Sequence, residues 1–393
     1  MILKDIDKQN AWSNLSLNGY IAQGDAQDPA FIRELVYGVL RNRILLDYNI
    51  DRFLRKPNIG ISERVLLRMG FYQLVMMDGV AEHAAVAETV KLAEAFVKGK
   101  KPFINAVLRN FQRSGSELEC PAKDKDYIKY LSVKYSVHES VVRLWTEAYG
   151  REQAEELLRI SNTVPPLTIR VNPLKCTDGK MPEDRSLDSG GFKNGLFSIQ
   201  DEASQHAVEL LDPKPGDLMM DLCAAPGGKS CCAAERMQNR GRILAFDLYE
   251  ARAGLIAKEA ERLGISIIEA GQHDASVFMP EFAAAADCVL CDVPCSGLGV
   301  LRRKPEIKLR DCSKAVKELP ELQKAILQTA ARYVKPGGKL MYSTCTLDPA
   351  ENEGVAQDFL NKNKDFAIEA EETLLPQEGG HDGFYICLMR KTN

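Results

Sequence analysis

One twelve-residue segment restricts the possible folds of this chain more than any other. It reads Met219-Met-Asp-Leu-Cys-Ala-Ala-Pro-Gly-Gly-Lys-Ser230, so an apolar strand runs into a glycine turn and then into an Ala-rich helix. In an open α/β sheet, ligands bind at such turns, because small residues let backbone amides approach the ligand and a helix N-terminus favours a negative group. The segment therefore predicts an open α/β sheet with a ligand site at this turn.

The sequence around this segment extends the α/β pattern. From Pro213 onward, short apolar runs alternate with amphipathic helices, which is typical of a mainly parallel sheet. The strands are expected at 218–222, 243–246, 265–268, 288–291, 339–342 and, at the end of the chain, 383–389. An apolar stripe from Leu319 to Val334 predicts a helix with Pro320 in its first turn and Pro336-Gly-Gly338 after its end.

The N-terminal part has a different pattern. Residues 1 to about 160 carry apolar positions at spacings of three and four, which predicts helix after helix. The run Pro165 to Pro173 is bracketed by prolines and alternates, so it predicts a strand that opens a small mixed subdomain. We expect three domains: an all-α domain at 1–125, a helical linker and small α+β subdomain at 126–212, and a Rossmann-like α/β domain at 213–393.

Composition excludes several classes of protein. Of the 393 residues 45% are hydrophobic and 27% charged, which is typical of globular proteins and excludes wholesale disorder. The net charge of -4 gives no global positive field, so a polyanion would have to be bound locally. The 11 cysteines form no dense disulfide framework, and there is neither a basic leader nor a run of about 18 apolar residues. These features predict a cytoplasmic protein without a membrane span.

Acidic residues at successive strand ends indicate the kind of cofactor. Asp247 lies 26 residues after Asp221, about where a carboxylate accepts both hydroxyls of a ribose, and Asp274 could reach an adenine edge in the same crevice. Each of these residues alone could equally cap a turn. A phosphate loop is the rival interpretation, but Cys223 stands where its first glycine is required. The order of the carboxylates favours a cofactor that contains a nucleoside over a triphosphate.

Two cysteines are expected at the same edge of the sheet. The fourth strand runs into Asp292-Val-Pro-Cys295, and the fifth ends in Ser343-Thr-Cys345. A thiolate that adds to carbon 6 of a pyrimidine makes carbon 5 enamine-like, so that it can attack an electrophilic methyl group. Asp292 could hydrogen-bond the base or hold the cofactor, and from the residues alone either thiol could be the nucleophile. Arg302-Arg-Lys304 lies just downstream and is expected to contact phosphate.

The remaining cysteines are interpreted as structural. Cys231, Cys232, Cys288, Cys291 and Cys387 are expected to be small buried hydrophobes. A zinc site at Cys288 and Cys291 is unattractive, because positions three apart on a strand face opposite sides. No metal site is predicted.

Three motifs together resemble the S-adenosylmethionine-dependent RNA 5-methylcytosine methyltransferases. They are Asp221-Leu-Cys-Ala-Ala-Pro-Gly-Gly-Lys229, Asp292-Val-Pro-Cys-Ser-Gly-Leu-Gly299 and Ser343-Thr-Cys-Thr346. The N-terminal segments 35–41, 82–90 and 105–110 resemble the helical RNA-binding domain related to the antitermination factor NusB. The resemblance covers nearly the whole chain, and it implies a ferredoxin-like, RNA-recognition-type middle subdomain.

The resemblance also implies roles for individual residues. Cys345 would be the nucleophile, and Cys295 would assist product release. The cofactor S-adenosyl-L-methionine would be lined by Cys223, Ala224, Ala225, Pro226, Gly227, Gly228, Lys229, Asp247, Asp274 and Asp292. The implied substrate is one cytosine of small-subunit (16S) ribosomal RNA, unstacked to meet the nucleophile, with no obligatory protein partner. The alternatives are a transfer RNA cytosine-5 methyltransferase, a catalytically idle RNA-binding protein and a magnesium-dependent NTPase.

Overall fold

The structure is a computed structural model that describes residues 2–9, 13–22, 28–176 and 190–392. The chain forms two compact units. The first comprises Met1–Val164 together with Leu301–Asp311, and the second comprises Pro165–Val300 together with Cys312–Asn393. In the part of the chain that the structure describes, no helix is long and apolar enough to cross a membrane.

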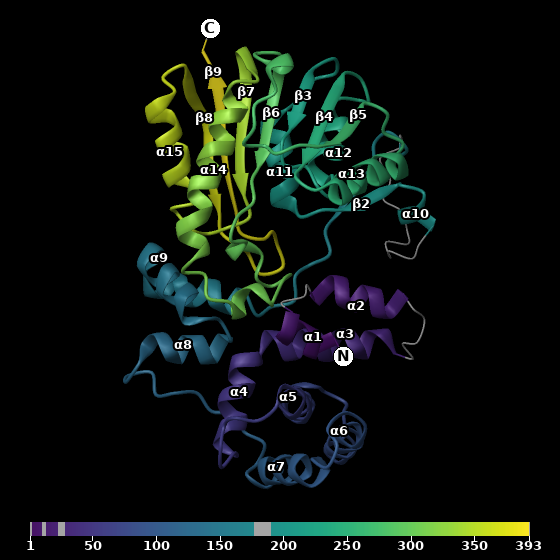
Figure 1. The fold of residues 1–393 in the computed structure, drawn as a ribbon, viewed down its shortest axis with the longest axis vertical. Helices are drawn as coiled ribbons and strands as arrows, with labels where there is room; N and C mark the ends of the chain where they lie inside the picture. Colours follow the sequence, from purple (N-terminus) through teal and green to yellow (C-terminus); the bar gives the residue numbers. More distant parts are fainter. Residues whose placement is uncertain (1, 10–12, 23–27, 177–189, 393) are drawn as a thin grey trace. The chain divides into compact units, whose positions relative to one another are not determined.

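The first unit is helical, as the apolar spacing predicts (Figure 1). Its helices are α1 (Ile2–Gln9), α2 (Ser13–Ala22), α3 (Pro29–Arg41), α4 (Arg43–Arg52), α5 (Ile61–Met76), α6 (Glu82–Phe96), α7 (Lys101–Arg113), α8 (Tyr127–Tyr135) and α9 (Glu139–Ile160). Asp28 caps α3 and Asp126 caps α8, each by accepting a backbone N–H three residues on. Phe71 and Phe111 stack in the core with ring centroids 3.9 Å apart.

A short segment from the α/β half of the sequence belongs to the helical unit. Lys308 is fully buried there, and its Nζ donates to the carbonyl of Tyr135 at 3.0 Å. Ser13 Oγ donates to Glu306 Oε2 at 2.7 Å, a contact that spans 293 positions of sequence. Arg302 is only 2% exposed, so the prediction that it contacts phosphate is wrong for this residue. Its neighbours Arg303 and Lys304 are partly exposed.

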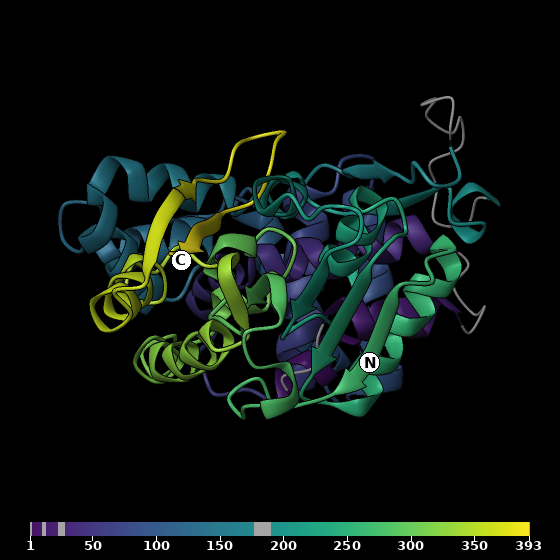
Figure 2. The same ribbon diagram turned by 90° about the horizontal axis from the view of Figure 1, so that it is seen from above.

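The second unit contains the expected mainly parallel sheet (Figures 1 and 2). Among the described residues it has seven strands in the order β5-β4-β3-β6-β7-β9-β8, with β9 antiparallel to both of its neighbours. The strands are β3 (Leu218–Asp221), β4 (Arg242–Asp247), β5 (Ile268–Gln272), β6 (Ala286–Asp292), β7 (Val334–Thr344), β8 (Phe366–Leu374) and β9 (Phe384–Lys391). A separate antiparallel pair is formed by β1 (Ile169–Val171) and β2 (Phe197–Ile199).

Helices cover both faces of the large sheet, as they do in doubly wound folds. They are α11 (Glu202–Leu211), α12 (Gly228–Arg236), α13 (Glu250–Leu263), α14 (Ala315–Ala331) and α15 (Glu353–Lys362), whereas the short helix α10 (Gly190–Lys193) contacts β2. Side chains of α14 and α15 pack in one buried cluster, and those of α11, α12 and α13 pack in another. Helices α14 and α15 lie side by side (Figures 1 and 2). Because both faces are buried, the central strands carry apolar side chains on both sides of the sheet, as at Val289 and Leu290 of β6.

Several predicted boundaries are wrong. The third predicted strand begins at Ile268, and residues up to Leu263 belong to α13, so the apolar run at Ile265 to Ile268 mostly precedes the strand. Helix α14 begins at Ala315, which places Pro320 inside the helix rather than in its first turn. Pro336-Gly-Gly338 was expected just after the end of this helix, but it lies within β7. The pairing of β7 with β6 has an irregular register. The sequence analysis also missed β8.

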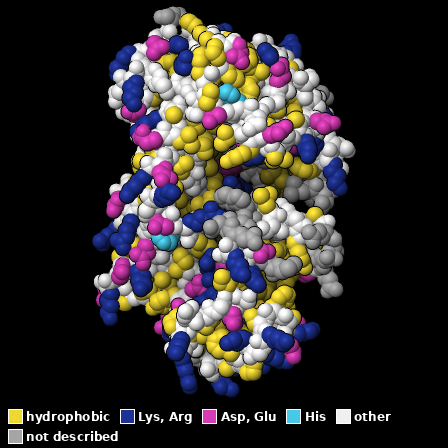
Figure 3. Space-filling view, in the orientation of Figure 1, with side chains coloured by type: hydrophobic (Ala, Val, Ile, Leu, Met, Phe, Trp, Pro, Cys, Tyr) yellow, Lys and Arg dark blue, Asp and Glu magenta, His cyan; other side chains and the backbone are white. Residues whose placement is uncertain are grey.

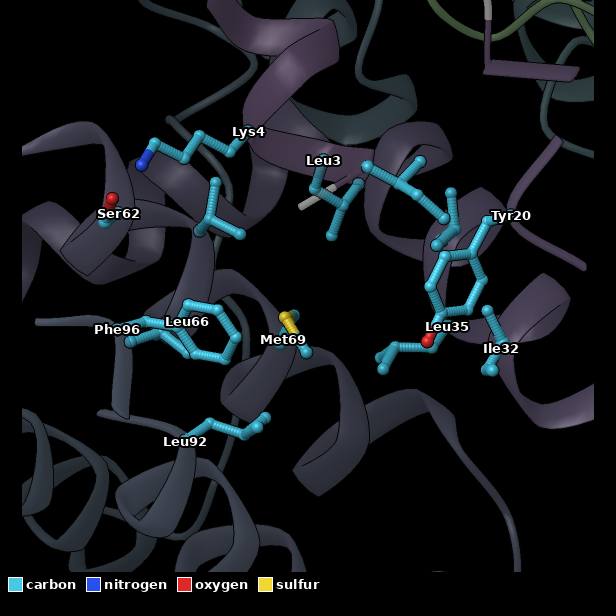
Figure 4. A pocket seen from close by; sticks show the side chains of 13 residues that line it. Leu3, Lys4, Tyr20, Ile32, Leu35, Ser62, Leu66, Met69, Leu92 and Phe96 are labelled. Atoms are coloured by element: carbon cyan, nitrogen blue, oxygen red, sulfur yellow. The ribbon is translucent and has the colours of Figure 1, made fainter. Parts of the chain in front are cut away.

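The helical unit has a mainly apolar, partly open pocket of about 410 Å³. It is lined by residues of α1, α2, α3, α5 and α6, and Leu3, Leu35 and Met69 surround its centre (Figure 4). Lys4, Tyr20 and Ser62 are the polar members of this lining. Such a lining lacks the convergent polar groups that orient a substrate, so the chemistry is sought at the sheet of the second unit.

Candidate active site

The turn after β3 has the compact geometry that its small residues predict. The amide of Ala224 donates to the carbonyl of Phe246 at 2.7 Å, and the amide of Gly227 donates to the carbonyl of Ala224 at 2.7 Å. Gly227 has φ 109°, a conformation that favours glycine, and a Cβ there would press on the backbone of Ile256 at 3.2 Å. A Cβ at Gly228 would meet only the amide of Gln200, at 3.7 Å. The first turn of α12 therefore has open space beside it.

A buried ion pair holds this turn from the β1 side. Arg170, on β1, is 7% exposed, and its Nε and Nη2 donate to the two carboxylate oxygens of Glu235 on α12 at 2.8 and 3.0 Å. Its Nη1 donates to the carbonyl of Gly228 at 3.0 Å and also contacts the Gln200 side chain. Arg170 is thus a positioning residue for the turn, and the sequence analysis did not single it out.

Carboxylates follow the carboxyl ends of β3 to β6, as predicted. Asp221 is fully buried, which raises its pKa to about 7. Ser230 Oγ donates to its Oδ2 at 2.6 Å, whereas its Oδ1 has no hydrogen-bond partner among the described residues. Asp247 is 4% exposed; its Oδ1 accepts from the amide of Tyr249 at 3.2 Å, and its Oδ2 lies 3.3 Å from Arg252.

Asp274 differs from these two residues because it is exposed. Its Oδ1 accepts from both the amide and the hydroxyl of Ser276, at 2.9 and 2.7 Å, and these hydrogen bonds lower its pKa. The side chain therefore fixes the turn after β5. A second role in contact with the adenine of a cofactor stays a prediction.

The two predicted thiols lie next to each other. Cys295 Sγ is 3.3 Å from Cys345 Sγ, although 50 residues separate them in sequence. The parallel pairing of β6 and β7 places Asp292 opposite Ser343, so the loops that follow both strands leave the sheet together. The hydrogen bond to Cys345, together with burial, raises the pKa of Cys295. This geometry is what the sequence analysis expected of two thiols at one sheet edge.

Asp292 and Lys229 form an ion pair between the cofactor turn and the thiols. Lys229 Nζ donates to Asp292 Oδ2 at 2.6 Å, and Ser343 Oγ donates to Asp292 Oδ1 at 3.1 Å. Burial acts to lower the pKa of Lys229, but the attraction of Asp292 outweighs it, and the pKa is raised. Cys345 contributes to this attraction as well. The charged ammonium of Lys229 thus lies where it favours negative charge on the Cys345 sulfur.

The residues present fit S-adenosyl-L-methionine. Its sulfonium and amino groups are cationic and its ribose presents two hydroxyl donors, so carboxylate acceptors at successive strand ends match these groups. Among the described residues, Asp221 Oδ1 has no hydrogen-bond partner, so it can act as an acceptor for such a group. The open space at Gly228 leaves room for the group.

The sequence analysis missed a group of residues behind the thiols. Glu351 and Asn352 are fully buried and hydrogen-bond to the two loops that carry Cys295 and Cys345. A signal was present, since Asp348-Pro-Ala-Glu-Asn352 lies a few residues after the fifth strand and contains three polar residues. Cys231, Cys288, Cys291 and Cys387 are buried, as expected, whereas Cys232 is partly exposed.

Comparison with known families shows three matches along the chain. Residues 208–390 match the model described as 16S rRNA methyltransferase RsmB/F, and residues 1–113 match the NusB family. Residues 140–184 match the ferredoxin-like domain of RsmF/B-like methyltransferases.

Individual proteins are similar over the full length. The chain is 36% identical to the probable ribosomal RNA small subunit methyltransferase B of Bacillus subtilis, over 98% of this chain and 96% of that protein. It is 32% identical to the corresponding protein of Synechocystis, over 100% and 98%. Among solved structures, PH0851 covers 99% of this chain, and 97% of its own length, with a TM-score of 0.79 and 26% identity. A methyltransferase homolog from Pyrococcus horikoshii covers 67% of this chain, and 99% of its own, with a TM-score of 0.56 and 26% identity.

Proposed function

Since this chain belongs to the family of 16S rRNA methyltransferases RsmB/F, which depend on S-adenosyl-L-methionine, we propose that it methylates carbon 5 of one cytosine in 16S rRNA. The reaction would pass through a covalent bond between Cys345 and carbon 6 of the base. The observation that carries this proposal is the 3.3 Å separation of the Cys295 and Cys345 sulfurs beside the Lys229–Asp292 pair.

The proposed reaction needs one thiol to activate the base and a second group to help release the product. The Cys345 thiolate adds to carbon 6, and carbon 5 becomes nucleophilic. Bound S-adenosyl-L-methionine supplies the methyl group that carbon 5 then takes. A base removes the proton from carbon 5, the bond between carbon 6 and sulfur breaks, and Cys345 leaves as a thiolate. Cys295 assists this last step.

Charges around the thiols support this division of roles. The raised pKa of Cys295 keeps its thiol protonated, so it can donate a hydrogen bond to the sulfur of Cys345 and stabilise negative charge there. Lys229 favours the same charge. Asp292, which lies between the two strand ends, is proposed to hold the ring nitrogen or the amino group of the cytosine while charge develops.

Single-thiol variants test the assignment. With 16S rRNA and S-adenosyl-L-methionine, we expect Cys345→Ala to give neither methylation nor a covalent protein–RNA adduct. Cys295→Ala should accumulate the adduct, because release fails. Cys288→Ala serves as the matched control, since this buried thiol lies on β6 away from the reacting pair. An adduct formed by Cys345→Ala and absent in Cys295→Ala would reverse the two roles.

RNA is proposed to contact the helical unit as well. From Ala95 to Ser116 the chain carries five cations, Lys98, Lys100, Lys101, Arg109 and Arg113, and no acidic residue. Lys and Arg side chains are visible on the part of the helical unit where α7 lies (Figures 1 and 3). A local concentration of positive charge of this kind suits phosphate contacts, although the chain as a whole is slightly acidic.

The main alternative within the same chemistry is a transfer RNA cytosine-5 methyltransferase. The NusB match and the full-length relatives favour ribosomal RNA. Bisulfite sequencing of both RNAs from cells with and without the gene decides between them. Loss of one cytosine mark in 16S rRNA supports the proposal, whereas loss of a transfer RNA mark alone keeps the chemistry and overturns the substrate. If neither RNA loses a cytosine mark although the protein is folded, the result favours a catalytically idle RNA-binding protein.

A further inference from the structure

The segment between β7 and α15 begins with Cys345, and its last two residues contact the loops of both thiols. Glu351 and Asn352, the last two residues of this segment, are each 0% exposed although one is charged and the other polar. Burying such groups is costly unless they are hydrogen-bonded to specific partners. Their partners therefore indicate what the two side chains are for.

Glu351 holds the loop that carries Cys295. Its Oε2 accepts from the amide of Ser296, the residue after Cys295, at 2.9 Å. The same oxygen accepts from Gln323 Nε2 on α14 at 2.8 Å, and Gln323 Nε2 also donates to the carbonyl of Pro294 at 3.0 Å. The residues on both sides of Cys295 are thus fixed by one carboxylate and one amide. Among the described residues, the second oxygen of Glu351 has no hydrogen-bond partner, so both of these hydrogen bonds fall on Oε2.

Asn352 holds the loop that carries Cys345. Its Oδ1 accepts from Thr344 Oγ1 at 2.6 Å, and its Nδ2 donates to the carbonyl of Thr346 at 3.1 Å. Asn352 is thus hydrogen-bonded to the residues on both sides of Cys345. Asn352 is also the N-cap residue of α15, where an asparagine side chain normally accepts a backbone N–H of the helix. Within the described part of the chain it makes no such cap. The helix thus lacks the stabilisation of a side-chain cap, and the Asn352 side chain hydrogen-bonds to the cysteine loop instead.

The two loops are also joined directly. Ser296 Oγ and Thr346 Oγ1 lie 2.7 Å apart, and the amide of Gly299 donates to the carbonyl of Cys345 at 2.9 Å. Tyr342 OH donates to the backbone carbonyl of Glu351 at 2.5 Å, which ties the segment to β7. The buried residues 351–352 therefore fix both cysteine loops relative to β7.

We propose that Glu351 and Asn352 are positioning residues that set the distance between the two thiols, Glu351 through the Cys295 loop and Asn352 through the Cys345 loop. Both side chains hydrogen-bond to residues that flank Cys295 and Cys345. The consequence of this arrangement is asymmetric: loss of Glu351 displaces the thiol that assists release, and loss of Asn352 displaces the nucleophile. The expected effects on nucleophile and release rest on the function proposed above. The control of the distance between the two sulfurs does not.

The distance can be tested without the methylation reaction. Diamide takes two protons and two electrons from a close thiol pair and leaves a disulfide, so its rate of forming the Cys295–Cys345 disulfide reports how often the sulfurs meet. Peptide mapping identifies that disulfide among the other thiols. We expect Glu351→Ala and Asn352→Ala to slow its formation about tenfold or more, and Glu351→Gln, which keeps the acceptor for Ser296, to remain near the wild-type rate. Glu353→Gln, at the exposed neighbouring position, is the matched control.

Kinetics with RNA then separate the two residues. Displacing a reacting group by about 1 Å costs about a hundredfold in rate, so kcat should fall in both alanine variants while the Kd for S-adenosyl-L-methionine stays unchanged. Glu351→Ala should accumulate the covalent RNA adduct, and Asn352→Ala should form less of it than wild type. If Asn352→Ala does not fold, Thr344→Val removes one hydrogen bond of the same contact without changing the volume of the side chain.

Each outcome has a defined meaning. Wild-type rates of disulfide formation in the alanine variants, or in Thr344→Val where it replaces Asn352→Ala, overturn the positioning role, whatever the reaction is. Slowed disulfide formation in a protein that methylates no cytosine supports the positioning role and overturns the proposed function. If Glu351→Gln slows disulfide formation as much as Glu351→Ala does, the role assigned to the carboxylate oxygen is also overturned.

Discussion

Replacing Arg170 with methionine tests how a buried ion pair supports the cofactor turn. Arg170 and Glu235 are 7% and 5% exposed and share two hydrogen bonds of 2.8 and 3.0 Å. Methionine fills much of the space of the arginine stem but leaves Glu235 buried without its cation. Breaking a buried pair in this way costs about 3–5 kcal/mol, because an uncompensated charge stays inside the protein.

The expected size of the effect is large enough to measure by thermal unfolding. A loss of about 3–5 kcal/mol lowers the Tm of a unit of this size by about 6–20 °C. The double variant Arg170→Met with Glu235→Leu removes both charges, and it should recover most of the lost stability, since apolar replacements of buried pairs are often neutral or stabilising. Circular dichroism melts of wild type, both single variants and the double variant provide the comparison.

The pH dependence gives an independent check. Burial raises the pKa of Glu235 even with Arg170 present, and removing Arg170 raises it further. An acid whose pKa is higher in the folded state binds more protons when folded, so it destabilises the fold progressively as pH rises through that range. The stability difference between wild type and Arg170→Met should therefore be smaller at pH 5 than at pH 8.

Cofactor binding separates the two contacts of Arg170. The double variant still lacks the donor to the carbonyl of Gly228, a hydrogen bond worth about 1 kcal/mol, so its Kd for S-adenosyl-L-methionine should stay roughly fivefold weaker than wild type. A Tm loss below about 2 °C in Arg170→Met, or a double variant as unstable as the single one, would refute the reasoning.

Three further predictions concern the site and the RNA. Gly299→Ala should abolish most activity and lower stability by about 1–3 kcal/mol, because its Cβ would lie 2.1 Å from the carbonyl oxygen of Gly383 and 2.9 Å from that of Cys345; activity within twofold of wild type would contradict this. The affinity for the cationic cofactor should rise with pH through about 7 as Asp221 ionises, and Asp221→Asn should flatten that profile in calorimetric titrations. Replacing Lys98 and Lys100 together with Gln should reduce the salt dependence of RNA binding, log K against log salt, by about 1–2 in slope, with Lys362→Gln on α15 as control.

Local sequence signals accounted for much of this site. The strand, glycine turn and helix at 219–230 were predicted because small residues and apolar runs act over a few neighbouring positions. Boundaries were less predictable where tertiary contacts override local preference, as with Pro320 inside α14 and Pro336 within β7. The division into domains at 125 and 212 stays a prediction.

The sequence by itself determined which chemical groups stand at the ends of which strands, since parallel strands bring their carboxyl ends to one edge whatever the loops do. That was enough to expect Asp292, Cys295 and Cys345 together. Only the tertiary structure decided that Arg302 and Lys308 are buried. It also decided that Glu351 and Asn352 hydrogen-bond to the thiol loops, so that Asn352 does not cap a helix. The contact of Lys308 with Tyr135 joins residues 173 positions apart. Whether a polar side chain finds a buried partner depends on how the chain packs, which a local sequence pattern does not determine.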